Sequence, residues 1–210
     1  MARAPQIETL FATRLYRADL GGAEITRLNT DLARASRAVA SDDVAGQDWS
    51  QRNLYSGYTS YASLNDLVWR DPDFADLAAR LEPHVAAFAK ACDFDLDGGR
   101  LELDSLWINI LEPGGVHSGH IHPHSVVSGA YYVEVPDGAS ALKFEDPRLP
   151  MMMAAPPRKA RAARDAKTHV SIAPRAGTLL LWESFLRHEV TRNDAAAQRI
   201  SISFNYAWIR

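Results

Sequence analysis

The spacing of apolar residues changes near residue 100 and divides the chain into two parts. Before this point, apolar residues recur at spacings of three and four, the period of an amphipathic α-helix. Two such stripes predict two helices; they consist of Ile25, Leu28, Leu32, Ala35 and Val39, and of Phe74, Leu77, Leu81, Val85 and Phe88. Asp71 and Pro72 suit the N-cap and the first position of the second helix. Residues 10–16 predict a short strand, whereas residues 41–61 give no clear signal.

After residue 100 the period becomes two, and β-forming residues dominate. Strands are predicted at residues 101–111, 130–135, 141–144, 168–172, 178–182, 188–192 and 199–208. Clusters of proline, glycine, asparagine and aspartate separate these runs and predict turns. Seven or eight short strands at this spacing are typical of an all-β sandwich or barrel. Residues 147–167 interrupt the pattern with methionines, prolines and basic residues.

The composition indicates one ordinary globular domain. The chain has 210 residues, of which 47% are hydrophobic and 23% charged. We expect a single domain over residues 1–210, with supporting helices in residues 1–99 and a β core in residues 100–210. Cys92 is the only cysteine, so an intrachain disulfide is impossible and a reducing compartment is expected. With a net charge of −3, no leader and no apolar span, we expect a cytoplasmic protein that binds neither nucleic acid nor membrane.

Histidines are concentrated in one short segment. Four of the seven lie within eight residues, at positions 117, 120, 122 and 124. In a strand, residues i and i+2 face the same side, so His120 and His122 can bind one metal ion. A third ligand must come from elsewhere, and His188 at the start of a later strand is the natural candidate. His117 has the wrong parity for a regular strand and is the lower-ranked alternative to either neighbour; a solvated histidine-rich turn is the competing interpretation.

The last predicted strand alternates strictly between apolar and polar residues. One face carries Ile200, Ile202, Phe204, Tyr206 and Trp208, and the other carries Arg199, Ser201, Ser203 and Asn205. Arg199 comes 11 residues after His188, so one turn and a return strand would bring it beside the metal. A guanidinium can hold a carboxylate in a bidentate pair, and the Ser201 hydroxyl can add a hydrogen bond. The polar face therefore predicts the wall of an organic-acid site.

These features together resemble the 2-oxoglutarate/Fe(II) oxygenases. More narrowly, they look like a group of uncharacterised bacterial proteins of that superfamily, with a layout near that of prolyl hydroxylases. The resemblance begins near residue 100. It rests on residues 107–115, His117, residues 120–123, 128–133, 144–148, 174–177 and 186–188, and on Arg199-Ile-Ser-Ile-Ser-Phe-Asn205.

The resemblance implies a mainly β fold with flanking helices, a double-stranded β-helix (a jelly-roll, cupin-like open barrel) with the metal at its mouth. It implies an oxygenase that uses Fe(II), 2-oxoglutarate and dioxygen to hydroxylate a small molecule or a peptide side chain. His120 and His188 would bind iron, and Arg199 with Ser201 would bind the distal carboxylate of 2-oxoglutarate. Asn109 and either Tyr131 or Tyr132 would also contact the co-substrate. Most members have aspartate or glutamate where this chain has His122, a change that alters metal selectivity and charge balance.

Two alternatives compete with this interpretation. Gly114, followed by five residues and His120-x-His122, fits the opening of a cupin motif, although the glutamate expected soon afterwards is missing. A non-catalytic metal-binding protein on the same scaffold is the second alternative. Residues 151–167 would be either a lid over the pocket or a mobile surface loop, with the loop favoured. Trp182 and Phe185 would be pocket wall or core, with core favoured.

Overall fold

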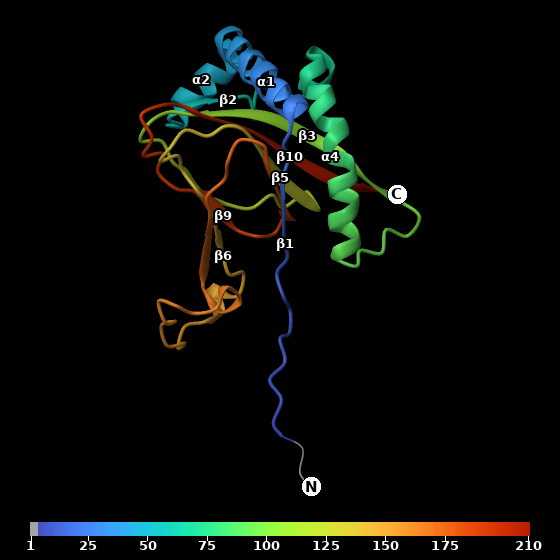
Figure 1. Cartoon of the computed structure of the whole chain (residues 1–210), viewed down its shortest axis with the longest axis vertical. Helices are drawn as coiled ribbons and strands as arrows, with labels where there is room; N and C mark the ends of the chain where they lie inside the picture. Colours follow the sequence, from blue (N-terminus) through green and yellow to red (C-terminus); the bar gives the residue numbers. More distant parts are fainter. Residues whose placement is uncertain (1–3) are drawn as a thin grey trace.

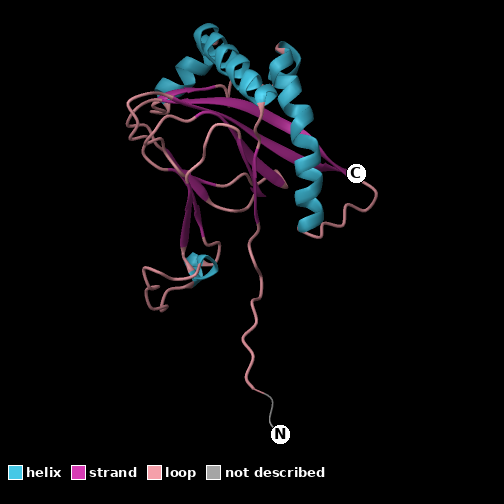
Figure 2. Ribbon diagram, in the orientation of Figure 1, coloured by secondary structure: helices cyan, strands magenta, loops and turns pink. Residues whose placement is uncertain are grey.

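The computed structural model describes residues 4–210 and consists of two β-sheets with helices on one side (Figure 2). The larger sheet has six strands in the order β1-β8-β5-β10-β3-β2, and the smaller has four in the order β4-β9-β6-β7. The strands are β1 (Leu15–Asp19), β2 (Gly57–Thr59), β3 (Arg100–Leu111), β4 (His117–His120), β5 (Val127–Glu134), β6 (Leu142–Glu145), β7 (His169–Ile172), β8 (Thr178–Glu183), β9 (His188–Val190) and β10 (Arg199–Ile209). The helices are α1 (Ala23–Asp42), α2 (Val44–Arg52), α3 (Leu67–Arg70) and α4 (Pro72–Ala91).

The long helices α1 and α4 cover the outer face of the larger sheet (Figure 1). Both predicted apolar stripes are the faces that pack on the sheet, where Leu32, Leu77 and Leu81 are fully buried. The Asp71 carboxylate accepts a hydrogen bond from the Asp73 backbone N–H at 2.8 Å, so the predicted N-cap of α4 is confirmed. The helices therefore support the sheet from outside, as expected.

Strand β10 lies inside the larger sheet and separates two environments. It pairs with β3 on one side and with β5 on the other, both antiparallel. Because side chains alternate across a strand, Ile200, Ile202 and Phe204 pack toward the helices. Arg199 and Ser201 face the inside of the molecule, where they line a cavity. The strict alternation seen in the sequence therefore separates a helix-covered face from a cavity-lining face.

The smaller sheet packs against the inner face of the larger one. Tyr132, Leu180 and Trp182 of the larger sheet share a buried apolar cluster with Leu142 and Phe144 of the smaller. The two sheets do not close into a barrel. This is the double-stranded β-helix with flanking helices that the sequence predicts, and its open interior contains the candidate site.

The prediction of a strand at residues 10–16 is wrong in position. Strand β1 begins at Leu15 and runs to Asp19, pairing with β8 at the edge of the larger sheet. Leu10 and Phe11 are exposed, and Phe11 has a φ of 55°, which a strand cannot accommodate. This stretch has β-forming residues, but no neighbouring strand lies beside it to pair with.

None of the helices in residues 4–210 combines the length and the apolar character needed to cross a bilayer.

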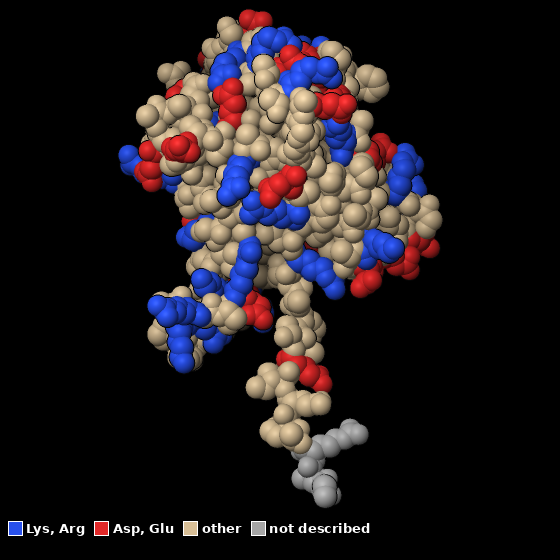
Figure 3. Space-filling model, viewed as in Figure 1, with Lys and Arg blue, Asp and Glu red and all other residues tan. Residues whose placement is uncertain are grey.

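The insertion at residues 147–167 extends away from the two sheets between β6 and β7 (Figure 1). It contains two short 3-10 turns, Leu149–Met151 and Arg164–Ala166. Basic side chains gather on this projection (Figure 3). None of its residues lines the cavity described below.

Candidate metal centre

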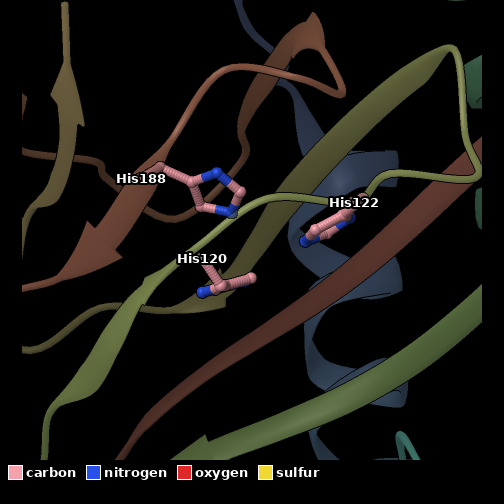
Figure 4. Close-up of side chains that lie close together, drawn as sticks. All are labelled: His120, His122 and His188. Atoms are coloured by element: carbon pink, nitrogen blue, oxygen red, sulfur yellow. The ribbon is translucent and has the colours of Figure 1, made fainter. Parts of the chain in front are cut away.

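Three histidine side chains converge between the two sheets (Figure 4). His120 is the last residue of β4 and His188 the first of β9, and these two residues are directly paired in the sheet register. His122 follows from the loop after β4. One potential ligand atom from each of the three residues lies within 4.8 Å of the others. This spacing is compatible with one transition-metal ion bound by three imidazoles.

The local geometry at His122 differs from the prediction. Strand β4 ends at His120, so His122 does not share a pleated strand face with it. Instead, the His122 backbone N–H donates to the Ser184 carbonyl at 3.0 Å, and its Nδ1 lies 2.6 Å from the Asn205 side-chain oxygen. The two imidazoles therefore come together through a tethered loop rather than through the period of a strand.

Hydrogen bonds fix the same tautomer in all three histidines. Nδ1 of His120 lies 2.8 Å from the Ser118 carbonyl oxygen, and Nδ1 of His188 lies 2.9 Å from that of Leu186. Since a carbonyl oxygen can only accept, each Nδ1 carries the proton.

The same tautomer follows at His122 from its partner Asn205. The Asn205 amide nitrogen donates to Ser105 Oγ at 3.1 Å, which leaves its oxygen to accept from His122 Nδ1. All three Nε2 atoms therefore present an unprotonated lone pair, as a metal requires, and each ring is oriented by an outer hydrogen-bond acceptor.

The electrostatics of the cluster also favour neutral rings. Burial and the neighbouring imidazoles lower the pKa of His188 to about 3. Burial lowers the pKa of His120 and of His122 as well. Metal ions bind the neutral form of imidazole, so no proton has to be displaced from these rings near neutral pH.

We expect the metal-free protein to lose stability as the pH falls below about 6.5. The unfolded histidines bind protons there, whereas His117 and His188 have folded pKa values of about 4 and about 3. Unfolding then takes up protons, and each group lowers the unfolding free energy by up to about 1.4 kcal/mol per pH unit. Urea denaturation from pH 7 to 5 measures the slope. His117→Asn should reduce this slope, whereas His169→Asn, at an exposed site, should not. An unfolding free energy of the wild type that does not change between pH 7 and 5 would contradict the lowered pKa values.

His117 lies closer to the cluster than its parity suggested. Between His117 and His120, β4 departs from regular pairing with β9, so a step of three residues on β4 matches a step of two on β9. This bulge turns His117 to the same side as His120, and the two rings stack with centroids 4.5 Å apart. His117 lines the cavity, but it is not part of the convergent trio. The parity argument therefore failed, although the ranking of His117 below its neighbours agrees with the geometry.

Arg199 is buried in the same cavity as the histidines. Its side chain donates to Ser140 Oγ at 2.5 Å and to Ser201 Oγ at 3.3 Å. Its guanidinium carbon lies 5.0 Å from the centre of the Tyr132 ring. Nε has no hydrogen-bond partner, and no carboxylate of the described residues forms an ion pair with Arg199. A buried cation without a counter-charge is costly, so this group is suited to receive an anionic ligand.

The two adjacent tyrosines face opposite sides of β5. Tyr132 lines the cavity, and its buried hydroxyl has no hydrogen-bond partner in the described residues. Tyr131 faces the helices, where its hydroxyl donates to Asn29 Oδ1 at 2.6 Å. The expectation that Tyr131 contacts the co-substrate is therefore wrong, because its ring lies on the other face of the sheet.

Asn109 lines the cavity from β3, as expected. Its side-chain oxygen accepts from Thr59 at 3.0 Å, and its amide nitrogen donates to Ser203 at 3.0 Å. These bonds link β2, β3 and β10 across the floor of the site. Asn109 is thus held rigidly, with its polar groups already engaged.

Two aromatic residues that line the cavity, Tyr55 and Trp107, were not anticipated as site residues. Trp182, expected as core or pocket wall with core favoured, is both, because it belongs to a buried cluster and also lines the cavity. Trp182 packs edge-on against His188 with centroids 4.8 Å apart. Phe185 was also expected in the core but is 51% exposed, because it lies in the turn between β8 and β9.

Fold and site together define the class of protein: a double-stranded β-helix with three convergent histidines and a buried arginine in one open interior. The family follows from the sequence. Residues 105–205 match the family described as "Putative 2OG-Fe(II) oxygenase", and the matched segment contains the histidine trio, Arg199 and Ser201. This segment, just under half of the chain, is thus similar to a family of Fe(II), 2-oxoglutarate-dependent oxygenases. No curated protein matches its sequence.

Solved structures share the fold at low sequence identity. The alpha-ketoglutarate-dependent epimerase SnoN from nogalamycin biosynthesis is 14% identical with a TM-score of 0.62, covering 93% of this chain and 78% of that one. HygX from Streptomyces hygroscopicus, solved with nickel and 2-oxoglutarate, is 15% identical with a TM-score of 0.59, covering 93% and 82%. A prolyl-4-hydroxylase from Pseudomonas putida is 12% identical with a TM-score of 0.57, covering 93% and 92%.

Proposed function

We propose that the protein is a hydroxylase in which His120, His122 and His188 bind Fe(II) and Arg199 with Ser201 binds the distal carboxylate of 2-oxoglutarate. The observation that carries this proposal is the convergence of one ring nitrogen from each of three histidines in a cavity that also contains a buried guanidinium. Three protein ligands leave coordination positions open for a bidentate co-substrate and for dioxygen.

The charges of the cavity fit the co-substrate. Three neutral imidazoles leave the full dipositive charge of the iron in place, and Arg199 adds one positive charge. 2-Oxoglutarate is a dianion, so one carboxylate can lie at the metal and the other at the guanidinium. Replacement of the usual carboxylate ligand by His122 therefore makes the site more positive and increases its attraction for an anionic ligand.

When bound, Fe(II) and 2-oxoglutarate supply the oxidising chemistry: dioxygen is consumed, 2-oxoglutarate becomes succinate and carbon dioxide, and one oxygen atom enters a C–H bond of the substrate. The protein orients and shields these groups. Asn205 and the carbonyls of Ser118 and Leu186 hold the three imidazoles in position. Trp182 packs on His188 and excludes water from that side of the site.

Succinate formation separates this function from its two rivals. Incubation with Fe(II), 2-oxoglutarate and oxygen should release succinate, and oxygen uptake should match it. A cupin-type enzyme or a non-catalytic metal-binding protein would bind the metal without consuming 2-oxoglutarate. The absence of cofactor-dependent succinate, even with a panel of small-molecule and peptide substrates, would contradict the proposal.

The adjacent tyrosines provide a matched pair of variants. Tyr132→Phe should weaken 2-oxoglutarate binding about fivefold to tenfold, because the free hydroxyl in the cavity is available to the ligand. Tyr131→Phe should leave the Kd unchanged and lower the unfolding free energy by about 1 kcal/mol, because it loses the bond to Asn29. Ligand titration and urea denaturation measure the two effects. Equal Kd values for the two variants would contradict a role for Tyr132.

We also propose that residues 1–210 form one oxygenase domain that works in the cytoplasm of a bacterium. Two buried clusters support the single domain, since one joins α1 and α4 to the larger sheet and the other joins the two sheets. The lone Cys92 and the bacterial sources of HygX and the prolyl-4-hydroxylase support the location.

A further inference from the structure

A row of aromatic rings connects the protein surface with the histidine cluster. Trp107, at the inner end, lies 5.8 Å from the His122 ring between centroids. Tyr61 packs edge-to-face on Trp107 at 5.3 Å, and Trp49 packs edge-to-face on Tyr61 at 6.2 Å. Three separate parts of the chain supply this aromatic row: α2, the turn after β2, and β3. It therefore exists only in the folded protein.

The middle ring of the row is the most exposed. Trp107 is 6% exposed and lines the cavity, Tyr61 is 60% exposed, and Trp49 is partly buried. The exposed surface of Tyr61 is thus next to a cavity-lining ring, two ring contacts from a proposed metal ligand. Contiguous apolar surface beside a cavity is typical of a binding surface, and the rings of Trp49, Tyr61 and Trp107 are in contact with one another in series.

The turn that carries Tyr61 is held rigidly. The Ser60 backbone N–H donates to the Ile108 carbonyl at 3.1 Å, and Ser60 Oγ accepts from the Ile108 N–H at 3.0 Å. The Tyr61 backbone N–H donates to Thr59 Oγ1 at 3.3 Å, and the same hydroxyl bonds to Asn109 in the cavity. A rigid aromatic anchor loses little conformational entropy when it binds a ligand.

The charged side chains beside the row are already paired. Arg52 forms an ion pair with Asp48 at 3.5 Å on the helix that carries Trp49. Asp43 accepts hydrogen bonds from Tyr58 at 2.8 Å and from Ser63 at 2.5 Å. Arg52, Asp48 and Asp43 therefore leave no unpaired charge beside the aromatic row. A ligand there would meet the faces and edges of the rings.

We propose that Trp49, Tyr61 and Trp107 form the binding surface for the oxidised substrate, and that the group they bind is an uncharged aromatic ring. This inference rests on the proposed function, because it places the substrate beside the metal. A ring in the substrate extends the edge-to-face series, whose members prefer centroid separations of about 4.5–7 Å. The ring is held at the mouth of the cavity, and a group attached to it reaches toward the histidines.

Two probes with the same number of ring carbons test the aromatic requirement. N-Acetyl-phenylalaninamide and N-acetyl-cyclohexylalaninamide are both uncharged, but only the first has an aromatic ring. Saturation-transfer NMR on the full chain, without metal and with Zn(II) plus 2-oxoglutarate, should show about tenfold tighter binding of the phenyl probe. Tyr61→Leu keeps apolar area but removes the ring, and it should abolish this preference. Trp69→Leu, at an exposed tryptophan outside the row, should not.

The outcomes separate this inference from the proposed function. Equal binding of the two probes, or a preference that survives Tyr61→Leu, overturns the aromatic surface, and so does an equal loss in Trp69→Leu. Mn(II) in place of Fe(II) then reports the distance between the metal and the probe. The ring protons of a phenyl probe bound at the aromatic row should relax faster when Mn(II) is present. If Mn(II) does not change the relaxation of water protons, that result contradicts only the proposed metal centre. The aromatic preference is decided separately, by the comparison of the two probes without metal.

Discussion

Replacing His188 with alanine is expected to abolish metal uptake. His188 is buried opposite His120 in the register of β4 and β9, so as a proposed ligand it would join the two strands across the ion. Loss of an outer hydrogen-bond partner typically lowers metal affinity about 10- to 100-fold, and loss of a direct ligand should exceed about a hundredfold. Co(II) titration followed by visible absorption measures this affinity without interference from oxygen.

The control for His188→Ala is His124→Ala. His124 belongs to the same histidine-rich segment but is exposed and does not line the cavity. It should bind Co(II) like the wild type, with an unchanged spectrum. Because His188 is buried, thermal unfolding of the metal-free variants establishes that both are folded. A folded His188→Ala protein with unaltered Co(II) affinity would show that the three-histidine centre is wrong.

Replacing Arg199 with glutamine should raise the Kd for 2-oxoglutarate by about a hundredfold, because charge-assisted hydrogen bonds contribute about 1.5–3 kcal/mol each. Metal affinity should not change. Metal-free stability should not fall, since the variant removes a buried cation that has no carboxylate partner. Quenching of tryptophan fluorescence can report binding, because Trp107 and Trp182 line the cavity.

Two further variants refine the test of Arg199. Arg199→Lys keeps the charge but loses the planar fork, so its Kd should lie between those of the wild type and Arg199→Gln. Arg187→Gln removes an exposed arginine that lies 3.7 Å from Glu145, and it should bind 2-oxoglutarate normally. Equal Kd values for Arg199→Gln and the wild type would exclude Arg199 as the carboxylate partner.

The sequence predicted those features that local periodicity encodes. In α1, α4 and β10, the two sides of the element lie in different environments. The apolar residues therefore show which side packs in the core. The facing of β5 could not be inferred in this way. Nearly all of its residues are buried on both faces, so no polar side distinguishes Tyr131 from Tyr132. Only the pairing with β10 and β8 determines which tyrosine faces the cavity.

The site itself was predictable in its residue types but not in its local geometry. The concentration of histidines and the Arg199 strand indicated a metal beside an organic acid. The bulge at His117 and the loop position of His122 depend on contacts with β9 and Asn205, far away in the chain. Tyr55 came from a stretch without periodicity, and its place beside His117 results from tertiary packing.

The most direct test of the central claim is anaerobic titration of the Fe(II)-loaded protein with 2-oxoglutarate. Chelation of the iron by the keto acid should produce a visible charge-transfer absorption that saturates at one equivalent. Arg199→Gln should require far more ligand for the same absorption, and His188→Ala should not produce it. Iron bound at one equivalent without any absorption change on adding 2-oxoglutarate would contradict a single site that holds both metal and co-substrate.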